Sequence, residues 1–246
     1  MIIDIHAHLW DGSFESDKRQ IRTVCERYKV SQVVVSSLGG YFPGREEIAR
    51  LNAATAAFMR EEPSLIRGWC YVNPRNPDAL DVLRHGIEDA GMSGIKLWVA
   101  TFCDDPLVFP LVEQCIRYRV PVLIHTFYKQ VGQLPFESLG GNVAALARRY
   151  PEAKLLMAHM GADCLRELKP IRPYSNIRVD TSGSIVHRDD IDYAKEMLGA
   201  DRIVFGTDMP MISFLLNYGQ IEEADLTPDE KDAIFCRNAQ RLLERG

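Results

Sequence analysis

Eight short apolar runs, separated by amphipathic segments, constrain the fold of this chain more than any other feature. Several of the runs are rich in β-branched residues, which favours strands. They cover residues 2–6, 32–37, 66–72, 93–98, 121–125, 154–159, 176–181 and 202–207. Between them, residues 45–61, 78–90 and 142–149 show the spacing of amphipathic helices.

Strands that alternate with helices predict a parallel sheet whose faces are covered by helices. Eight such strands in 246 residues fit a (β/α)8 TIM barrel, an α/β fold. Asp78 is the expected N-cap of the 78–90 helix, and Gly91 its C-cap. A doubly wound open sheet is the alternative, but no G-x-G-x-x-G follows the first strand. We find no linker-like segment and expect one domain over residues 1–246.

The composition restricts the class of partner. Basic residues number 29 and acidic residues 34, and there is no strong basic block, which argues against nucleic acid or an anionic membrane. With no signal peptide or long apolar run, we expect a cytoplasmic protein that acts on a small molecule. A homodimer is left open. The six cysteines are scattered, which is typical of buried reduced thiols.

The first strand carries the first functional signal, His6-Ala-His8. Side chains alternate along a strand, so His6 and His8 share one face, and we expect Ile3, Ile5 and Ala7 on the other. Two neutral imidazoles side by side are half of a divalent metal site. The motif is short, so its meaning depends on whether further ligands follow later strands.

Four later residues supply that test. Lys96 lies in the fourth strand, His125 and His159 end the fifth and sixth, and Asp208 follows the eighth. In a barrel the carboxyl ends of all strands face one mouth, where active sites are built. Gly94 and Gly206, at interior positions, are expected to leave room below a ligand. The predicted metal ligands are His6, His8, Lys96, His125, His159 and Asp208, and the expected metal is Zn²⁺, as one or two ions.

These motifs resemble a known family. Asp4-Ile-His-Ala-His8, Gly94-Ile-Lys-Leu97, Pro121-Val-Leu-Ile-His-Thr126, Met157-Ala-His-Met-Gly161 and Phe205-Gly-Thr-Asp-Met-Pro210 are similar to those of the amidohydrolase superfamily. The closest resemblance is to its branch of TIM-barrel metal-dependent hydrolases, which also holds aminocarboxymuconate semialdehyde decarboxylase. Asn238-Ala-Gln-Arg-Leu-Leu243 resembles that branch's closing helix.

The resemblance implies two alternatives for the metal. In a mononuclear site the ligands match His6, His8, His125 and Asp208, and His159 matches a supporting or catalytic histidine. In a binuclear site Lys96 matches the carbamylated lysine that bridges two ions, with His125 and His159 on the second ion. We expect two metals. The alternative keeps Lys96 as an ammonium group beside a single ion.

The expected activity is hydrolysis of a small cyclic amide, lactone or ester. A metal lowers the pKa of its bound water, and Asp208 is the expected proton acceptor, so Asp208 and His159 are the catalytic candidates. Asp4 is expected to orient interior polar groups rather than bind metal. Two alternatives are non-oxidative decarboxylation of an aromatic or unsaturated acid and a non-catalytic metal-binding barrel.

Residues in the loops after the strands are the substrate-binding candidates. Arg45 or Lys129 could pair with a substrate carboxylate. His187 is a further candidate contact, whereas His85 is expected to be solvated on the polar side of its helix. The substrate-binding set is Trp10, Arg45, Trp98, Tyr128 and Lys129.

Overall fold

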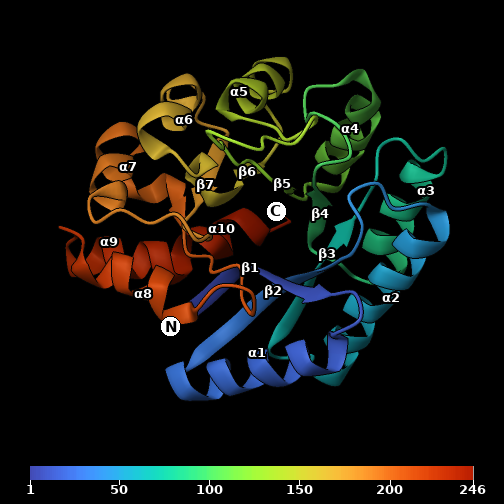
Figure 1. Ribbon diagram of the computed structural model, residues 1–246, viewed down its shortest axis with the longest axis horizontal. Coiled ribbons are helices and arrows are strands. Elements are labelled where there is room, and N and C mark those ends of the chain that lie inside the picture. Colours follow the sequence, from blue (N-terminus) through green and yellow to red (C-terminus); the bar gives the residue numbers. More distant parts are fainter. Residues whose placement is uncertain (246) are drawn as a thin grey trace.

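Eight parallel strands form a single barrel in the computed structural model, which describes residues 1–245. Each strand pairs with the next one in the sequence, and helices surround the ring (Figure 1). The strands are β1 (Ile2–Trp10), β2 (Val30–Leu38), β3 (Ile66–Tyr71), β4 (Gly94–Leu97), β5 (Val122–Ile124), β6 (Leu155–Met157), β7 (Ile177–Asp180) and β8 (Ile203–Val204). All eight overlap the predicted runs, although β1 extends four residues further and β8 is shorter, and the α/β TIM-barrel prediction is confirmed.

The helices follow the strands along the chain. They are α1 (Phe14–Tyr28), α2 (Arg45–Glu61), α3 (Ala79–Arg84), α4 (Phe109–Tyr118), α5 (Gly140–Arg149), α6 (Cys164–Ile171), α7 (Asp190–Leu198), α8 (Phe214–Glu223), α9 (Pro228–Asp232) and α10 (Asn238–Leu243). The predicted 78–90 helix continues from α3 into a π-helical turn, His85–Asp89. Asp78 precedes α3 as expected, but its side chain forms an ion pair with Arg45 instead of capping the helix. Gly91 has a φ of +69° just beyond the helix, which suits glycine.

The barrel closes where β1 meets β8 and the segment that follows it. Ile5 N donates to Phe205 O at 3.0 Å, and His8 N donates to Met209 O at 2.9 Å. Asp208 N also donates to His6 O at 2.7 Å. This closure places Asp208 directly beside the two histidines of β1.

A change of register in β1 alters which of its side chains face inward. The pairing of β1 with β2 is irregular between Asp4 and Ala7. Ile3 and Ile5 therefore belong to the interior cluster, whereas Ala7 and Leu9 pack in the cluster beneath the helices. The expectation that Ile3, Ile5 and Ala7 share one face is wrong, because a strand alternates strictly only where its pairing is regular.

A packed apolar layer fills the barrel interior beneath the carboxyl ends of the strands. Trp69 is fully buried in the barrel, and its Nε1 donates to Ile5 O at 2.9 Å. A Cβ added at Gly94 would lie 2.6 Å from the Trp69 ring, so this ring fills the space that Gly94 was expected to leave open. Residues of α10 join the same cluster and cover the end of the barrel away from the site (Figure 1).

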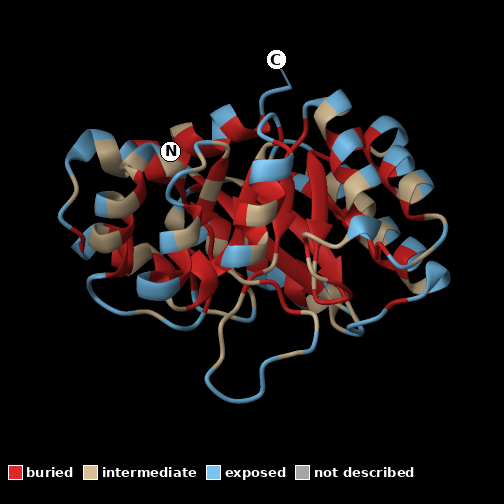
Figure 2. Ribbon diagram, turned by 90° about the horizontal axis from the view of Figure 1, so that it is seen from above, coloured by how far each residue is buried: buried red, intermediate tan, exposed pale blue. Residues whose placement is uncertain are grey.

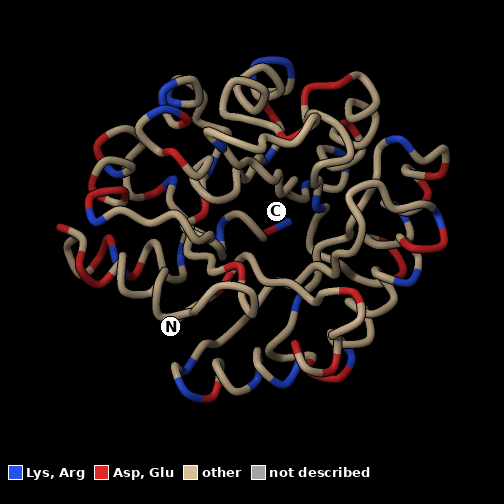
Figure 3. The backbone as a smooth tube through the Cα atoms, in the orientation of Figure 1, with Lys and Arg blue, Asp and Glu red and all other residues tan. Residues whose placement is uncertain are grey.

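Burial and charge follow the barrel pattern. The strands and the inner faces of the helices are buried, while exposed residues lie on the outer faces and loops (Figure 2). Charges of both signs are spread over the surrounding helices (Figure 3). All six cysteines are free and buried, as expected. Within residues 1–245, no helix is both long and apolar enough to cross a membrane.

Candidate metal centre

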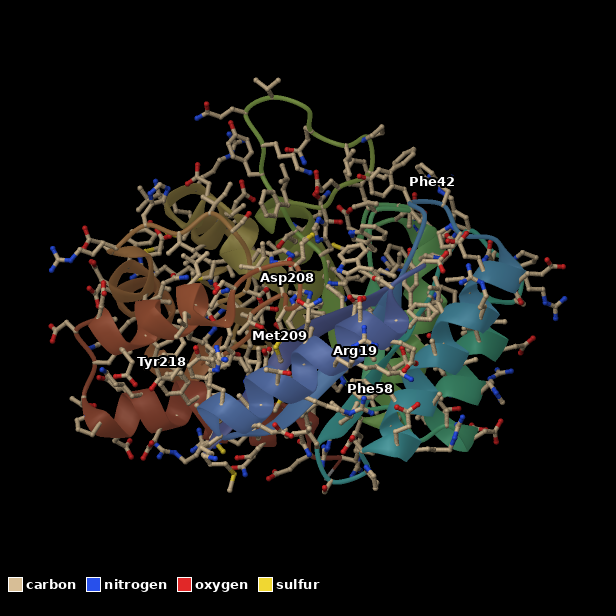
Figure 4. All side chains as sticks on the ribbon, turned by 60° about the horizontal axis from the view of Figure 1, so that its bottom comes forward. Arg19, Phe42, Phe58, Asp208, Met209 and Tyr218 are labelled. Carbon is tan, nitrogen blue, oxygen red and sulfur yellow. The ribbon has the colours of Figure 1, made fainter. Side chains whose placement is uncertain are left out.

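Three donor side chains converge where the barrel closes. His6 Nε2 lies 3.0 Å from His8 Nε2, and His8 Nε2 lies 3.0 Å from Asp208 Oδ1. His6 Nε2 is 3.9 Å from the same carboxylate oxygen. All three residues are buried, and together they form one of the groups that could hold a metal ion. Asp208 lies near the middle of the molecule, on the side from which the β5–α5 loop projects (Figure 4).

Each of the two imidazoles has an oxygen partner at its Nδ1. His6 Nδ1 lies 2.9 Å from Asp180 Oδ2, and His8 Nδ1 lies 3.2 Å from Ser36 O. Asp180 can only accept, so His6 carries its proton on Nδ1 and its Nε2 lone pair faces the group. His8 Nδ1 also lies 2.9 Å from the Ser36 hydroxyl, and with Ser36 O as acceptor His8 can offer Nε2 to a metal in the same way. His6 Nε2, His8 Nε2 and Asp208 Oδ1 thus face one space, with 3.0 Å between neighbouring atoms. The donor set therefore fits a divalent cation.

Burial also sets the charge states that a metal requires. It is the largest cause of a pKa for His6 well below the ordinary value, and Lys96 adds to the effect. Burial alone would raise the pKa of Asp208, but the His8 hydrogen bond and the neighbouring histidines lower it far below the ordinary value. At neutral pH the imidazole of His6 is neutral and Asp208 is ionised, which are the ligating forms.

Lys96 borders this group from β4. Its Nζ lies 3.0 Å from His6 Nε2, and the side chain is fully buried. Burial lowers the pKa of Lys96 to about 8, although Asp180 and Asp208 oppose the shift. Among the described residues, no carboxylate forms an ion pair with it. An anion that entered the site would find this amine beside the metal group.

A second group joins His6, His159 and Asp180. The Ser182 hydroxyl lies among them, 2.9 Å from both His6 Nδ1 and His159 Nδ1, and it also bonds to Asp180. Asp180 Oδ1 further accepts a hydrogen bond from His159 N at 2.9 Å. This group is therefore a closed hydrogen-bond network that orients the histidines. Asp180 was not among the predicted site residues. Its position at the end of β7, like that of His125 after β5, is the signal that could have identified it.

His125 belongs to neither group of the described residues. Its Nε2 lies 2.8 Å from Glu137 Oε1, and its Nδ1 lies 3.2 Å from His159 Nε2. That His125 shares a metal with His6 stays a prediction, and a buried loop carboxylate holds the ring through Nε2. Glu137 was also overlooked, and its position within a loop gives no periodic signal.

The backbone supports the site at strained positions. His159 and Asp208 have φ values of +60° and +64°, in the left-handed region that non-glycine residues rarely adopt. Such conformations persist only where the surrounding contacts hold them, and they concentrate at functional sites. Asp4, buried beneath, accepts hydrogen bonds from His6 N and Thr207 and binds the two segments together, in the orienting role expected of it.

Aromatic rings form one wall above the metal group. The Trp10 ring centroid lies 5.5 Å from that of His8 and 6.0 Å from that of Trp98. The Trp98 centroid is 6.4 Å from that of His125. The structure thus brings the predicted Trp10 and Trp98 together beside the candidate metal ligands.

The other substrate-binding candidates contact charged side chains of the protein. The Arg45 side chain is 79% exposed and pairs with Asp78, the residue before α3. The Tyr128 ring lies 4.1 Å from the Arg166 guanidinium. Lys129 forms an ion pair with the buried Glu137. His187 is exposed in the β7–α7 segment, and His85 is 76% exposed and paired with Asp89.

Solved structures share this fold at low sequence identity. 2,6-Dihydroxybenzoate decarboxylase from Rhizobium is 16% identical, with a TM-score of 0.78, and the match covers 98% of both chains. Dihydroxybenzoic acid decarboxylase from Polaromonas, solved with manganese and 2-nitroresorcinol, is 17% identical, with a TM-score of 0.76 over 98% of this chain and 96% of that chain.

A hydratase has the same architecture. 4-Oxalomesaconate hydratase from Rhodopseudomonas palustris is 20% identical, with a TM-score of 0.72 over 100% of this chain and 96% of that chain. The comparison with curated proteins gave no match. The amidohydrolase family model matches residues 3–245. With His6, His8 and Asp208 gathered at the mouth of its barrel, this chain is a metal-dependent enzyme that belongs to the amidohydrolase family.

Proposed function

We propose that this protein is a metal-dependent, non-oxidative decarboxylase of a small aromatic or unsaturated carboxylic acid. The observation that carries the proposal is the Lys96 amine, which lies 3.0 Å from His6 Nε2 without a carboxylate partner among the described residues. A carboxylate bound at the metal group would meet this amine as a second cation. The aromatic wall of Trp10 and Trp98 suits a planar substrate. Structural similarity to two decarboxylases of hydroxybenzoates agrees with this function.

The metal ligands proposed here are His6, His8 and Asp208. A divalent cation bound there would hold the substrate oxygens and stabilise the negative charge that develops in the reaction. A single ion is favoured, because the Ser182 hydroxyl already bridges His6 and His159 in the second group. Manganese is as suitable as the expected zinc, since both accept imidazole and carboxylate ligands.

Proton transfer is assigned to Asp208. Being ionised, Asp208 first accepts a proton from a substrate hydroxyl or from water. The bond between the substrate carbon and its carboxyl group then breaks, and the electron pair stays on that carbon. The carboxyl group leaves as carbon dioxide, and the carbon takes the proton from Asp208. His159, fixed by Ser182 and His125, lines the same space as a neutral imidazole, since burial lowers its pKa to about 4.

The test is product analysis with the full chain loaded with Mn²⁺ or Zn²⁺. We expect carbon dioxide from at least one member of a panel of hydroxybenzoates and unsaturated acids, with one deuterium at the vacated carbon in D₂O. Asp208→Asn should abolish release, and Asp81→Asn, whose side chain is 78% exposed, should not change it. Turnover of a lactone or amide with no carbon dioxide from any acid would reject decarboxylation.

Hydrolysis is the second candidate, and one observation favours it. Because the pKa of Lys96 is about 8, part of its population is a neutral amine, which is the form that carbon dioxide carbamylates. A carbamylated Lys96 could bridge two ions, as the resemblance implies. Mass spectrometry of the native protein in bicarbonate, with Lys96→Met as the control, separates the two proposals: a carbamate lost in the variant favours hydrolysis, and an unmodified lysine favours decarboxylation.

A further inference from the structure

The proposed metal centre is almost entirely enclosed. The exposed fraction of the side chain is 0% for His6, 3% for His8 and 9% for Asp208. The Lys96 side chain beside them is also fully buried. A substrate has to contact these groups in order to react, so part of the wall around them has to move when a ligand enters.

The segment that joins β2 to α2, residues 39–44, covers one side of this wall. The Tyr41 ring centroid lies 5.2 Å from that of Trp98, and the Phe42 centroid lies 6.2 Å from that of Phe136 in the β5–α5 loop. Figure 4 shows Phe42 on the side of the molecule from which that loop projects. The segment therefore connects the aromatic wall of the site with a loop from a strand three places further around the barrel.

Hydrogen bonds hold the two ends of this segment but not its middle. Gly40 N donates to Glu47 Oε1 at 2.7 Å, and Pro43 O accepts from Asn73 Nδ2 at 2.9 Å. Within residues 1–245, the two aromatic residues between these points form no hydrogen bond through either backbone or side chain. Their rings are 49% and 55% exposed. Side-chain packing alone holds the middle of the segment, which makes it easy to displace.

Two polar groups beside Trp98 lack a partner while the segment is in place. Trp10 Nε1 and the Tyr71 hydroxyl are enclosed, and no described residue forms a hydrogen bond with either. The Trp10 and Tyr71 rings lie 6.0 and 6.3 Å from the Trp98 ring, measured between centroids. An enclosed donor without an acceptor is costly, so this arrangement favours the entry of a ligand that carries one.

We propose that residues 39–44 are a gate over the metal centre, closed by Tyr41 against Trp98 and by Phe42 against Phe136. The gate lifts to admit a planar acid and closes over it, which keeps water away from the bound substrate. The proposal rests on the proposed metal centre, but it does not depend on the reaction assigned to that centre.

The first test compares the rate of Mn²⁺ release with the affinity for Mn²⁺ in the full chain. A gate that does not touch the metal changes the rates of binding and release by the same factor, so the affinity stays constant. Stopped-flow mixing with excess chelating dye measures release, and calorimetry measures affinity. Because Tyr41→Ala removes one aromatic contact, we expect release to be about 3- to 10-fold faster at unchanged affinity. Leu215→Ala on α8, where the residue is 53% exposed, is the control and should change neither quantity.

The contact between the two loops is tested in the same way. Phe42→Ala should accelerate release in the wild-type background but not in a Phe136→Ala background, because both changes remove the same contact. An unchanged release rate in Tyr41→Ala and in Phe42→Ala would overturn the proposal. Faster release with an equal loss of affinity would also overturn it, since that result describes a damaged metal site.

The second test needs no metal. The chain has three tryptophans, and Trp69 is fully buried in the barrel, so Trp10 and Trp98 report on the site. We expect the acrylamide quenching constant of metal-stripped Tyr41→Ala to be about 1.5- to 2-fold that of the wild type, because Trp98 loses its cover. Leu215→Ala should match the wild type, and equal quenching in all three proteins would contradict the gate. Carbon dioxide release enters neither test, so failure of the decarboxylase function leaves both results readable.

Discussion

At the scale of single residues, each proposed metal-binding nitrogen is oriented by an oxygen on another strand. Asp180 on β7 accepts from His6, and Ser36 on β2 accepts from His8. Such partners fix the tautomer and the direction of the ring, and they raise the basicity of the ligand. The precision of the site therefore depends on residues that do not touch the metal.

Asp180→Asn tests that dependence. The amide cannot supply the negative charge that holds His6 Nδ1–H, so we expect affinity for Mn²⁺ to fall about 10- to 100-fold. Asp189→Asn is the control, because Asp189 is exposed at the start of α7 and its side chain makes no capping bond. Competition with a chelating dye measures both affinities. Equal Mn²⁺ affinity in wild type and Asp180→Asn would show that this carboxylate does not orient His6.

At the scale of secondary-structure elements, close contact between β1 and β8 joins the ligands. Gly206 follows β8, and a Cβ added there would lie 3.0 Å from His6 Cβ and 3.3 Å from Ile5 Cγ2. This approach allows the two segments to exchange backbone hydrogen bonds. The position of Asp208 relative to His6 is thus fixed by the absence of a side chain at residue 206.

Gly206→Ala should separate the two segments. We expect it to destabilise the fold by about 1–3 kcal/mol through overpacking and to weaken metal binding as His6 moves. Gly141→Ala is the matched control, since a Cβ at this position in the first turn of α5 meets nothing within 4 Å. That change should stabilise the protein by about 0.4–1 kcal/mol. Urea denaturation measures both, and the same midpoint for the two variants would refute the close-contact argument.

The same elements show which features could be predicted from the sequence. Strand positions were predictable because apolar runs mark them, and His6, His8 and Asp208 followed because strand ends meet at one mouth. The change of register in β1 could not be predicted, because it depends on how β1 pairs with β2. The burial of Glu137 could not be predicted, because hydrogen bonds place the residues of a loop and leave no periodic pattern in the sequence. The ion pair between Arg45 and Asp78 could not be predicted either, because it depends on how the start of α2 packs beside α3.

At the scale of the whole molecule, the barrel buries all six thiols. Burial raises the pKa of Cys25, Cys70 and Cys103 to about 12. An unfolded chain loses these protons near the ordinary thiol pKa of about 8.5. The folded state therefore binds more protons above that pH, and stability decreases as the pH rises through this range.

We expect two results from this burial. A thiol reagent at pH 8 should leave the native protein unmodified and label all six cysteines in urea. The urea concentration at the unfolding midpoint should decrease as the pH is raised from 7.5 to 10. Rapid labelling of the native protein, or a midpoint that rises over this range, would contradict the packing described for the thiols.

The most direct test of the metal centre is a calorimetric titration of the metal-stripped full chain with Mn²⁺ and with Zn²⁺. We expect one saturable site in the wild type, which is lost in His8→Asn and in Asp208→Asn. The site should be retained in His85→Asn, whose side chain is 76% exposed. No saturable binding in the wild type, or binding that survives both His8→Asn and Asp208→Asn, would contradict a metal centre at the junction of β1 and β8.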